Sequence, residues 1–167
     1  EEYLPEINQI KILNKDLSSS ERDIPITMRH LLTHTSGFVY FFNSLRVMED
    51  LGMSPGDWPQ PEALSPDEYD WGFNAPQPRQ IFEAGERWHY GRSLGIAGRV
   101  IEKVSGLDLD TYFKENIFEP LGMDRSGYNL SESIRNDLMP MSMRDVSSGA
   151  LSALPSMRPI PMKRFYR

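Results

Sequence analysis

Apolar residues recur along the chain at intervals of three and four, which is the spacing of an amphipathic helix. The clearest run consists of four apolar residues: Leu94, Ala97, Ile101 and Val104. Gly106 follows this run, and glycine commonly ends helices because it accepts a left-handed backbone conformation. The pattern therefore predicts a helix over residues 94–104.

Two more helices are predicted in the first third of the chain. Thr27 precedes the first, where its hydroxyl can accept hydrogen bonds from the free amides of the first turn. Ile26 and Leu31 fit the staple positions around this cap, and Gly37 ends the helix. The second helix is predicted near residues 40–51. The apolar positions at helical spacing in and just before it are Phe38, Phe41, Phe42, Leu45 and Met48.

The remaining elements are shorter. Asp108 is predicted to cap a fourth helix that ends at Pro120. The apolar face of this helix consists of Leu109, Tyr112, Phe113 and Ile117. A short fifth helix is predicted over residues 134–139, and short strands are predicted around Ile10 and Ile12 and over residues 87–90. The predicted fold class is α+β, with helices predominating.

Proline divides the predicted elements. Six prolines fall between positions 55 and 78: Pro55, Pro59, Pro61, Pro66, Pro76 and Pro78. The same stretch carries the aromatic residues Trp58, Tyr69, Trp71 and Phe73. It predicts an ordered surface excursion or lid over residues 53–80, with a merely packed loop as the alternative. A second proline cluster predicts an irregular C-terminal stretch over residues 140–167. Residues 1–167 as a whole are predicted to form one helical domain segment.

Composition and charge exclude several classes of function. The chain has 18 Lys and Arg against 24 Asp and Glu, a net charge of −6, and therefore no global attraction for nucleic acid or an anionic membrane. It has no cysteine, which excludes thiolate catalysis and Cys-ligated zinc. No apolar run approaches the ~18 residues of a membrane span. We expect a soluble protein, with a cytoplasmic location favoured.

Two motifs suggest chemistry that the rest of the chain does not support. His30 and His34 are four residues apart, but the residues between them lack the glutamate of a zinc protease motif. We therefore expect no metal and no cofactor, and we expect His34 to hydrogen-bond helix carbonyls or the turn after it. Residues 91–95 match Gly-x-Ser-x-Gly, yet a nucleophile elbow at Ser93 needs a histidine downstream and the last one is His89.

Tyr90 is the candidate catalytic residue. It stands just before the predicted helix over residues 94–104, and Arg92 is two residues further on. A phenol is a poor base at neutral pH, but the positive end of a helix and a nearby cation both stabilise its phenolate. Tyr90 is therefore a candidate general base. The alternative is an ordinary packed aromatic residue.

Three motifs in order carry a resemblance to a known family. They are ITMRHLLTHTSG at residues 26–37, GERWHY at residues 85–90, and Gly106 followed by PLGM at residues 120–123. From about residue 3 to residue 128 the chain resembles the serine β-lactamase-related family. That family includes class C β-lactamases, D-alanyl-D-alanine peptidases, family VIII carboxylesterases and fungal polyketide acyltransferases. The chain looks most similar to the esterase and fungal acyltransferase branch.

The resemblance implies an acyl-enzyme mechanism, in which a serine from a Ser-x-x-Lys motif attacks an ester or amide. Tyr90 matches the family's catalytic tyrosine, which with the lysine activates that serine. The residues that the resemblance places at the substrate are Arg92, Tyr40, Val39 and Trp88. Arg92 stands where the lactamases have asparagine, so we expect no efficient β-lactamase activity.

The family's other signatures are not in this sequence. No serine is followed three residues later by lysine, and no Lys-Thr-Gly or His-x-Gly motif is present. The resemblance implies that the nucleophile lies before Leu4 and the main sheet after residue 167. The expected partners are therefore a small ester or acyl substrate and the rest of the same polypeptide, and the segment alone is expected to be inactive. A non-catalytic binding or scaffold paralogue and a standalone interaction domain are the alternatives.

Overall fold

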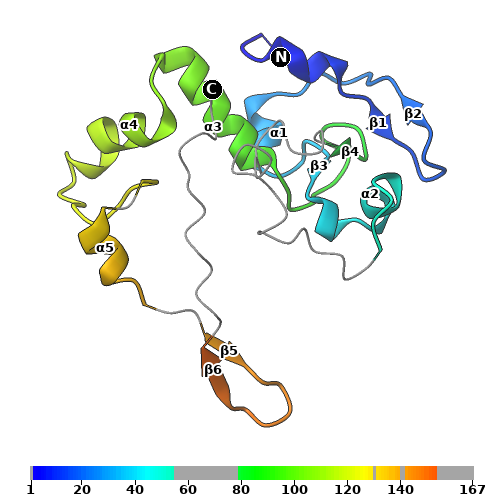
Figure 1. Ribbon diagram of the computed structural model, residues 1–167. Coiled ribbons are helices and arrows are strands. Elements are labelled where there is room, and N and C mark those ends of the chain that lie inside the picture. The colour runs from blue at the N-terminus through cyan, green and yellow to red at the C-terminus, as the bar shows by residue number, and fades with distance from the viewer. Residues whose placement is uncertain (1, 55–78, 130, 140–141, 154–167) are drawn as a thin grey trace. The chain divides into compact units, whose positions relative to one another are not determined.

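A computed structural model describes residues 2–54, 79–129, 131–139 and 142–153 (Figure 1). The described residues fall into two compact units, one up to Leu109 and one from Asp110 onward. Most of the predicted excursion, residues 55–78, lies outside the described part of the chain. The helices and short strands together confirm an α+β fold class.

A small sheet of four strands organises the first unit. The strands are β1 Ile12–Leu13, β2 Ser19–Ser20, β3 Phe38–Val39 and β4 Arg79–Gln80, in the order β2-β1-β4-β3. β4 is central, because Gln80 pairs with Ile12 in parallel and with Phe38 antiparallel. The strand predicted around Ile12 is confirmed. The strand predicted over residues 87–90 is wrong, since that segment is irregular. The strand that pairs with β1 and β3 is β4, earlier in the chain.

Three helices and two short 3₁₀ turns complete the first unit. Their bounds are η1 Pro5–Gln9, α1 Met28–Leu32, η2 Phe41–Asn43, α2 Leu45–Asp50 and α3 Ser93–Ser105. The Thr27 cap is confirmed, since the hydroxyl oxygen of Thr27 accepts a hydrogen bond from the His30 amide. The end of α3 at Gly106 is also confirmed, with φ of 72° at that glycine.

The single helix predicted near residues 40–51 is wrong in its first half. There the chain forms η2, and α2 starts only after Ser44, whose hydroxyl accepts a hydrogen bond from the Val47 amide. Phe38, which shares the helical spacing, lies in β3 and is completely buried. Phe38 is in a strand because it pairs with Gln80, although its spacing to the next apolar residues is that of a helix.

Two clusters of buried residues stabilise the first unit. The first consists of Leu4, Ile7, Ile26, Leu31, Phe38, Ala84, Ile96 and Ala97, and it joins α1 to α3, which contact each other (Figure 1). The second consists of Leu13, Val39, Val47, Ile81 and Phe82, and it packs α2 against the strands. Removing this apolar surface from water stabilises the unit by about 25 cal/mol per Å² buried.

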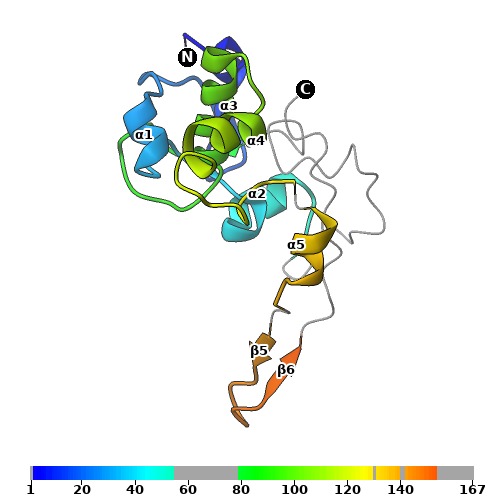
Figure 2. The same ribbon diagram turned by 90° about the vertical axis from the view of Figure 1, so that its left-hand side faces the viewer.

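The second unit contains α4, a π-helical turn η3, α5 and a hairpin. Their bounds are α4 Leu109–Phe113, η3 Lys114–Phe118, α5 Glu132–Asn136, β5 Ser142–Arg144 and β6 Leu151–Ala153. Leu109, the first residue of α4, is the last residue of the first unit. A fourth and a fifth helix are confirmed in these parts of the chain, but with different bounds. The fourth becomes π-helical after Phe113, and the fifth spans residues 132–136 instead of 134–139. The Leu109 amide donates to the carboxylate of Glu102. Within the stretch predicted to be irregular, β5 and β6 pair antiparallel (Figure 2). None of the helices in the described ranges is long and apolar enough to cross a membrane.

Candidate active site around Tyr90

A close backbone contact places the start of α3 against β3. Gly91 is buried, and a Cβ atom added there would lie 2.7 Å from the Val39 Cα and even closer to the Phe38 carbonyl oxygen. Only glycine fits, because any side chain would overlap the main chain of β3. This contact brings Tyr90 and Arg92 beside the residues that follow β3.

A buried hydrogen bond holds the same junction. The hydroxyls of Ser36 and Ser93 lie 2.7 Å apart and share a hydrogen bond, and both residues are fully buried. Ser36 also accepts a hydrogen bond from the Phe38 amide. Because Ser93 is the first residue of α3, this bond ties the helix start to the turn before β3. The burial of Ser93 supports the interpretation that it is not a nucleophile.

Five aromatic rings gather at this junction. We call them the aromatic cluster: His34, Tyr40, Phe42, Trp88 and Tyr90. The ring centroid of Tyr90 lies 4.9 Å from that of His34 and 5.9 Å from that of Tyr40. Tyr40 stacks on Phe42 at 5.0 Å, and His34 meets Trp88 at 6.4 Å. Tyr90 is 51% exposed and Trp88 65%, so the cluster borders on solvent and can meet a ligand.

The electrostatics of Tyr40 connect it to two other candidate residues. Burial raises the pKa of the Tyr40 phenol above its ordinary value, the proximity of Tyr90 raises it further, and the Arg92 guanidinium opposes the shift. Tyr40 therefore stays protonated at neutral pH and can donate a hydrogen bond. The opposing effect of Arg92 also shows that its positive charge reaches this part of the cluster.

Val39, a predicted substrate-binding residue, is placed differently from the others. Its side chain is only 2% exposed and packs in the second buried cluster with Val47 and Phe82. The side chain therefore does not face a ligand, and Val39 contributes to the site through its main chain against Gly91.

His34 was not predicted as a site residue. Its predicted hydrogen bond to a helix carbonyl is made by its main chain, since the His34 amide donates to the Leu31 carbonyl at 3.3 Å. Its Nδ1 atom is buried and has no hydrogen-bond partner. The imidazole that bonds its own helix is His30, whose Nδ1 accepts a hydrogen bond from the Thr27 amide. His34 instead adopts a left-handed backbone with φ of 54°. The signal in the sequence is a polar aromatic residue near the end of the predicted helix, two residues before Ser36.

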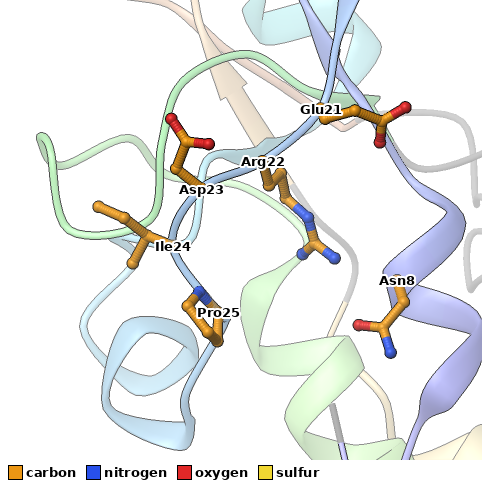
Figure 3. Close-up of a pocket in the computed structure, with 6 residues that line it drawn as sticks. All are labelled: Asn8, Glu21, Arg22, Asp23, Ile24 and Pro25. Carbon is orange, nitrogen blue, oxygen red and sulfur yellow. The ribbon is translucent and has the colours of Figure 1, made fainter.

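A surface pocket lies elsewhere on the first unit. It has a volume of about 190 Å³ and is lined by Asn8, Glu21, Arg22, Asp23, Ile24 and Pro25. Figure 3 shows the Arg22 side chain between Asn8 and Pro25. Arg22 donates a hydrogen bond to the Ile7 carbonyl, so it serves the packing of η1. The pocket shares no residue with the aromatic cluster. Within the described ranges no group of three or more metal-ligating side chains occurs.

The chain is similar to a known family over almost its whole length. Residues 1–159 match the family described as Beta-lactamase. Monacolin J acid methylbutanoyltransferase from Aspergillus terreus is 36% identical over 113 residues, which are 67% of this chain and 25% of that protein. Lovastatin esterase from Penicillium rubens is 34% identical over 131 residues, 77% of this chain and 31% of that protein.

A solved structure of a related enzyme also resembles this chain in fold. A mutant of simvastatin synthase from Aspergillus terreus superposes with a TM-score of 0.74 at 28% identity, covering 93% of this chain and 36% of that one. The chain thus spans about a third or less of the length of the relatives it matches. These matches confirm the β-lactamase and transpeptidase type of fold and the resemblance drawn from the three motifs.

Proposed function

The chain belongs to the Beta-lactamase family, and from this premise we propose that it is part of a serine esterase or acyltransferase with Tyr90 as its general base. The nucleophile, a serine of a Ser-x-x-Lys motif, lies outside these 167 residues. The relatives named as a methylbutanoyltransferase and as an esterase support acyl-ester chemistry.

The observation that carries the proposal is the position of Tyr90. The side chain is half exposed at the solvent-facing edge of the aromatic cluster, three residues before the 13-residue helix α3. The close contact of Gly91 with β3 and the buried Ser93 hydroxyl fix the main chain that follows it. Catalytic groups need such support, because small displacements cost large factors in rate.

The proposed reaction has two steps. In the first, the Tyr90 oxygen accepts the proton of the serine hydroxyl as that serine attacks the ester carbonyl, and returns the proton to the departing alcohol when the C–O bond breaks. In the second, water or another alcohol gives up its proton to the same oxygen and attacks the acyl carbonyl, and Tyr90 passes that proton to the serine oxygen as the bond between the acyl group and the serine breaks. Water yields hydrolysis, and an alcohol yields acyl transfer.

The neighbouring residues supply charge and apolar surface. The Arg92 guanidinium, whose positive charge lowers the pKa of Tyr40 against the effect of burial, can attract a negatively charged group of the substrate such as a carboxylate. Tyr40 stays protonated and donates a hydrogen bond to the substrate. The exposed ring of Trp88 offers a surface on which the acyl group packs.

The test compares wild-type full-length protein with Tyr90→Phe, using p-nitrophenyl butyrate as the acyl donor. We expect turnover to fall by ~10²–10⁴-fold, which is the usual contribution of a general base. Tyr3→Phe is the matched control, because Tyr3 is also about half exposed but lies before η1. Equal turnover by Tyr90→Phe and wild type would overturn the role of Tyr90.

The same assay distinguishes an acyltransferase, an esterase and a non-catalytic paralogue. Adding an alcohol acceptor diverts product from acid to ester if the protein is an acyltransferase, and leaves the acid unchanged if it is an esterase. Absence of turnover, together with a gene that encodes no Ser-x-x-Lys before Glu1, would assign the protein to the non-catalytic binding paralogues.

A further inference from the structure

We propose that His34 is a positioning residue, whose imidazole ring fixes the orientation of the Tyr90 phenol. The inference rests on the proposed role of Tyr90 as general base. Its basis is three observations on His34: an unfavourable backbone conformation, a hydrogen bond to the residue before Tyr90, and a ring contact with Tyr90 itself.

The backbone of His34 is strained. With φ of 54° it is one of two non-glycine residues in the described ranges that have positive φ, the other being Leu17. A side chain makes this conformation unfavourable, because its Cβ approaches the following carbonyl oxygen. Glycine would remove the cost, and asparagine would lower it. Strain of this kind clusters at functional sites, where the surrounding structure enforces it.

Hydrogen bonds enforce the strained conformation. The amide of His89 donates to the His34 carbonyl at 2.9 Å, and the Thr35 amide donates to the His30 carbonyl at 2.9 Å. The Gly85 amide donates to the Thr35 carbonyl at 2.8 Å. The turn after α1 is therefore tied to both ends of the segment over residues 85–89, which leads directly into Tyr90.

The imidazole ring of His34 contacts the phenol ring of Tyr90, which the hydrogen bonds to residues 85–89 bring close to it. The two ring centroids are 4.9 Å apart with an angle of 43° between the planes, closer than the 5.9 Å between Tyr90 and Tyr40. Because Tyr90 is half exposed, such contacts restrict the rotation of its side chain. His34 also meets Trp88, so one ring supports two candidate site residues.

The shape of the ring, and not its nitrogen, carries the proposed role. Nδ1 of His34 is buried and makes no hydrogen bond, so phenylalanine would keep the contact surface and remove an unpaired polar atom. Asparagine would adopt the left-handed backbone readily and remove the ring. The two substitutions therefore separate the ring from the backbone conformation.

The test measures kcat and KM of the full-length protein for p-nitrophenyl butyrate with His34→Asn and His34→Phe. We expect His34→Asn to lower kcat by about 10- to 100-fold, which is the scale of misplacing a catalytic group, with KM nearly unchanged. We expect His34→Phe to retain most of the wild-type kcat. Leu17→Asn is the control, since it relaxes the other residue with positive φ, in the β1–β2 turn away from the aromatic cluster. Leu17 also packs against the second buried cluster, so we expect a lower Tm with kcat unchanged.

A second measurement does not depend on turnover. With 3-fluorotyrosine incorporated at position 90, we expect one sharp fluorine resonance in wild type and in His34→Phe, and a shifted or broadened one in His34→Asn. An unchanged kcat and an unchanged resonance in His34→Asn would overturn the inference, as would an equal loss in His34→Phe. If wild type shows no turnover, the proposed function fails, and the resonances still decide whether His34 orients Tyr90.

Discussion

Replacing Gly91 by alanine should weaken the junction on which the site depends. The added Cβ would lie 2.7 Å from the Val39 Cα and closer still to the Phe38 carbonyl oxygen, both of them main-chain atoms. Main chain in a paired strand cannot move aside as the end of a flexible side chain can. The start of α3 must therefore shift away from β3.

The cost of that shift can be bounded from known substitutions. Overpacking a well-packed interior typically costs about 1–3 kcal/mol, and a backbone clash lies at the upper end. An unfolding entropy of about 2.1 cal/mol/K per residue applies to a full-length protein as long as the relatives, of which this chain matches 25% and 31%. About 3 kcal/mol then corresponds to a loss of roughly 3 °C in Tm. Tyr90 moves with the helix start, so we also expect turnover to fall.

Gly95 on the same helix provides the matched control. A Cβ atom added at Gly95 meets nothing within 4 Å. Gly95→Ala should therefore gain up to about 1 kcal/mol of helix propensity and raise Tm slightly. The assay is thermal unfolding of the full-length protein with turnover measured in parallel. Equal Tm values for Gly91→Ala and Gly95→Ala would refute the argument from the close contact.

Two further predictions concern a buried hydroxyl and a partly buried carboxyl. Ser93→Ala removes the hydroxyl that shares a hydrogen bond with Ser36, whose oxygen then keeps only the hydrogen bond from the Phe38 amide. The free energy of unfolding should fall by about 1–3 kcal/mol in urea titrations, while turnover is lowered but persists. Complete loss of turnover in a folded variant would contradict the structural role of Ser93. Burial raises the pKa of the Glu102 carboxyl above its ordinary 4.5, the Leu109 amide and Arg99 oppose the shift, and Asp108 adds to it. The folded state therefore favours the protonated carboxyl, and the free energy of unfolding falls as pH rises through the raised pKa. Glu102→Gln, whose amide oxygen still accepts from Leu109, should lose less Tm than wild type between pH 4 and pH 7, and parallel Tm profiles would exclude this effect.

Local signals predicted the elements that depend on local interactions. Thr27 and Gly106 act on the backbone within one turn of a helix, so the start of α1 and the end of α3 could be predicted from them. β4 could not be predicted, because both of its residues, Arg79 and Gln80, are polar, and Gln80 belongs to the sheet only through pairing with Ile12 and Phe38. Strand pairs far apart in sequence leave little trace in the local pattern.

The candidate site shows the same division. Tyr90, Arg92 and Tyr40 were expected together from the motifs, and the structure brings these three close to one another. The sequence could not reveal that Val39 faces the core, because a strand of two residues has no alternation to read. It could not reveal the role proposed for His34 either, since a left-handed backbone at a non-glycine residue becomes visible only in the folded chain.

The junction at Tyr90 is expected to couple stability to the proposed activity. Three contacts hold it: Gly91 against β3, Ser93 bonded to Ser36, and His89 bonded to His34. Each joins the segment around Tyr90 to residues 34–39, which run from the turn after α1 through β3, and the two serines are 57 positions apart in sequence. The site is therefore formed only when the first unit is folded, and its geometry is set by long-range contacts. A substitution that loosens any of the three should lower stability and kcat together, whereas Gly95→Ala should change stability alone.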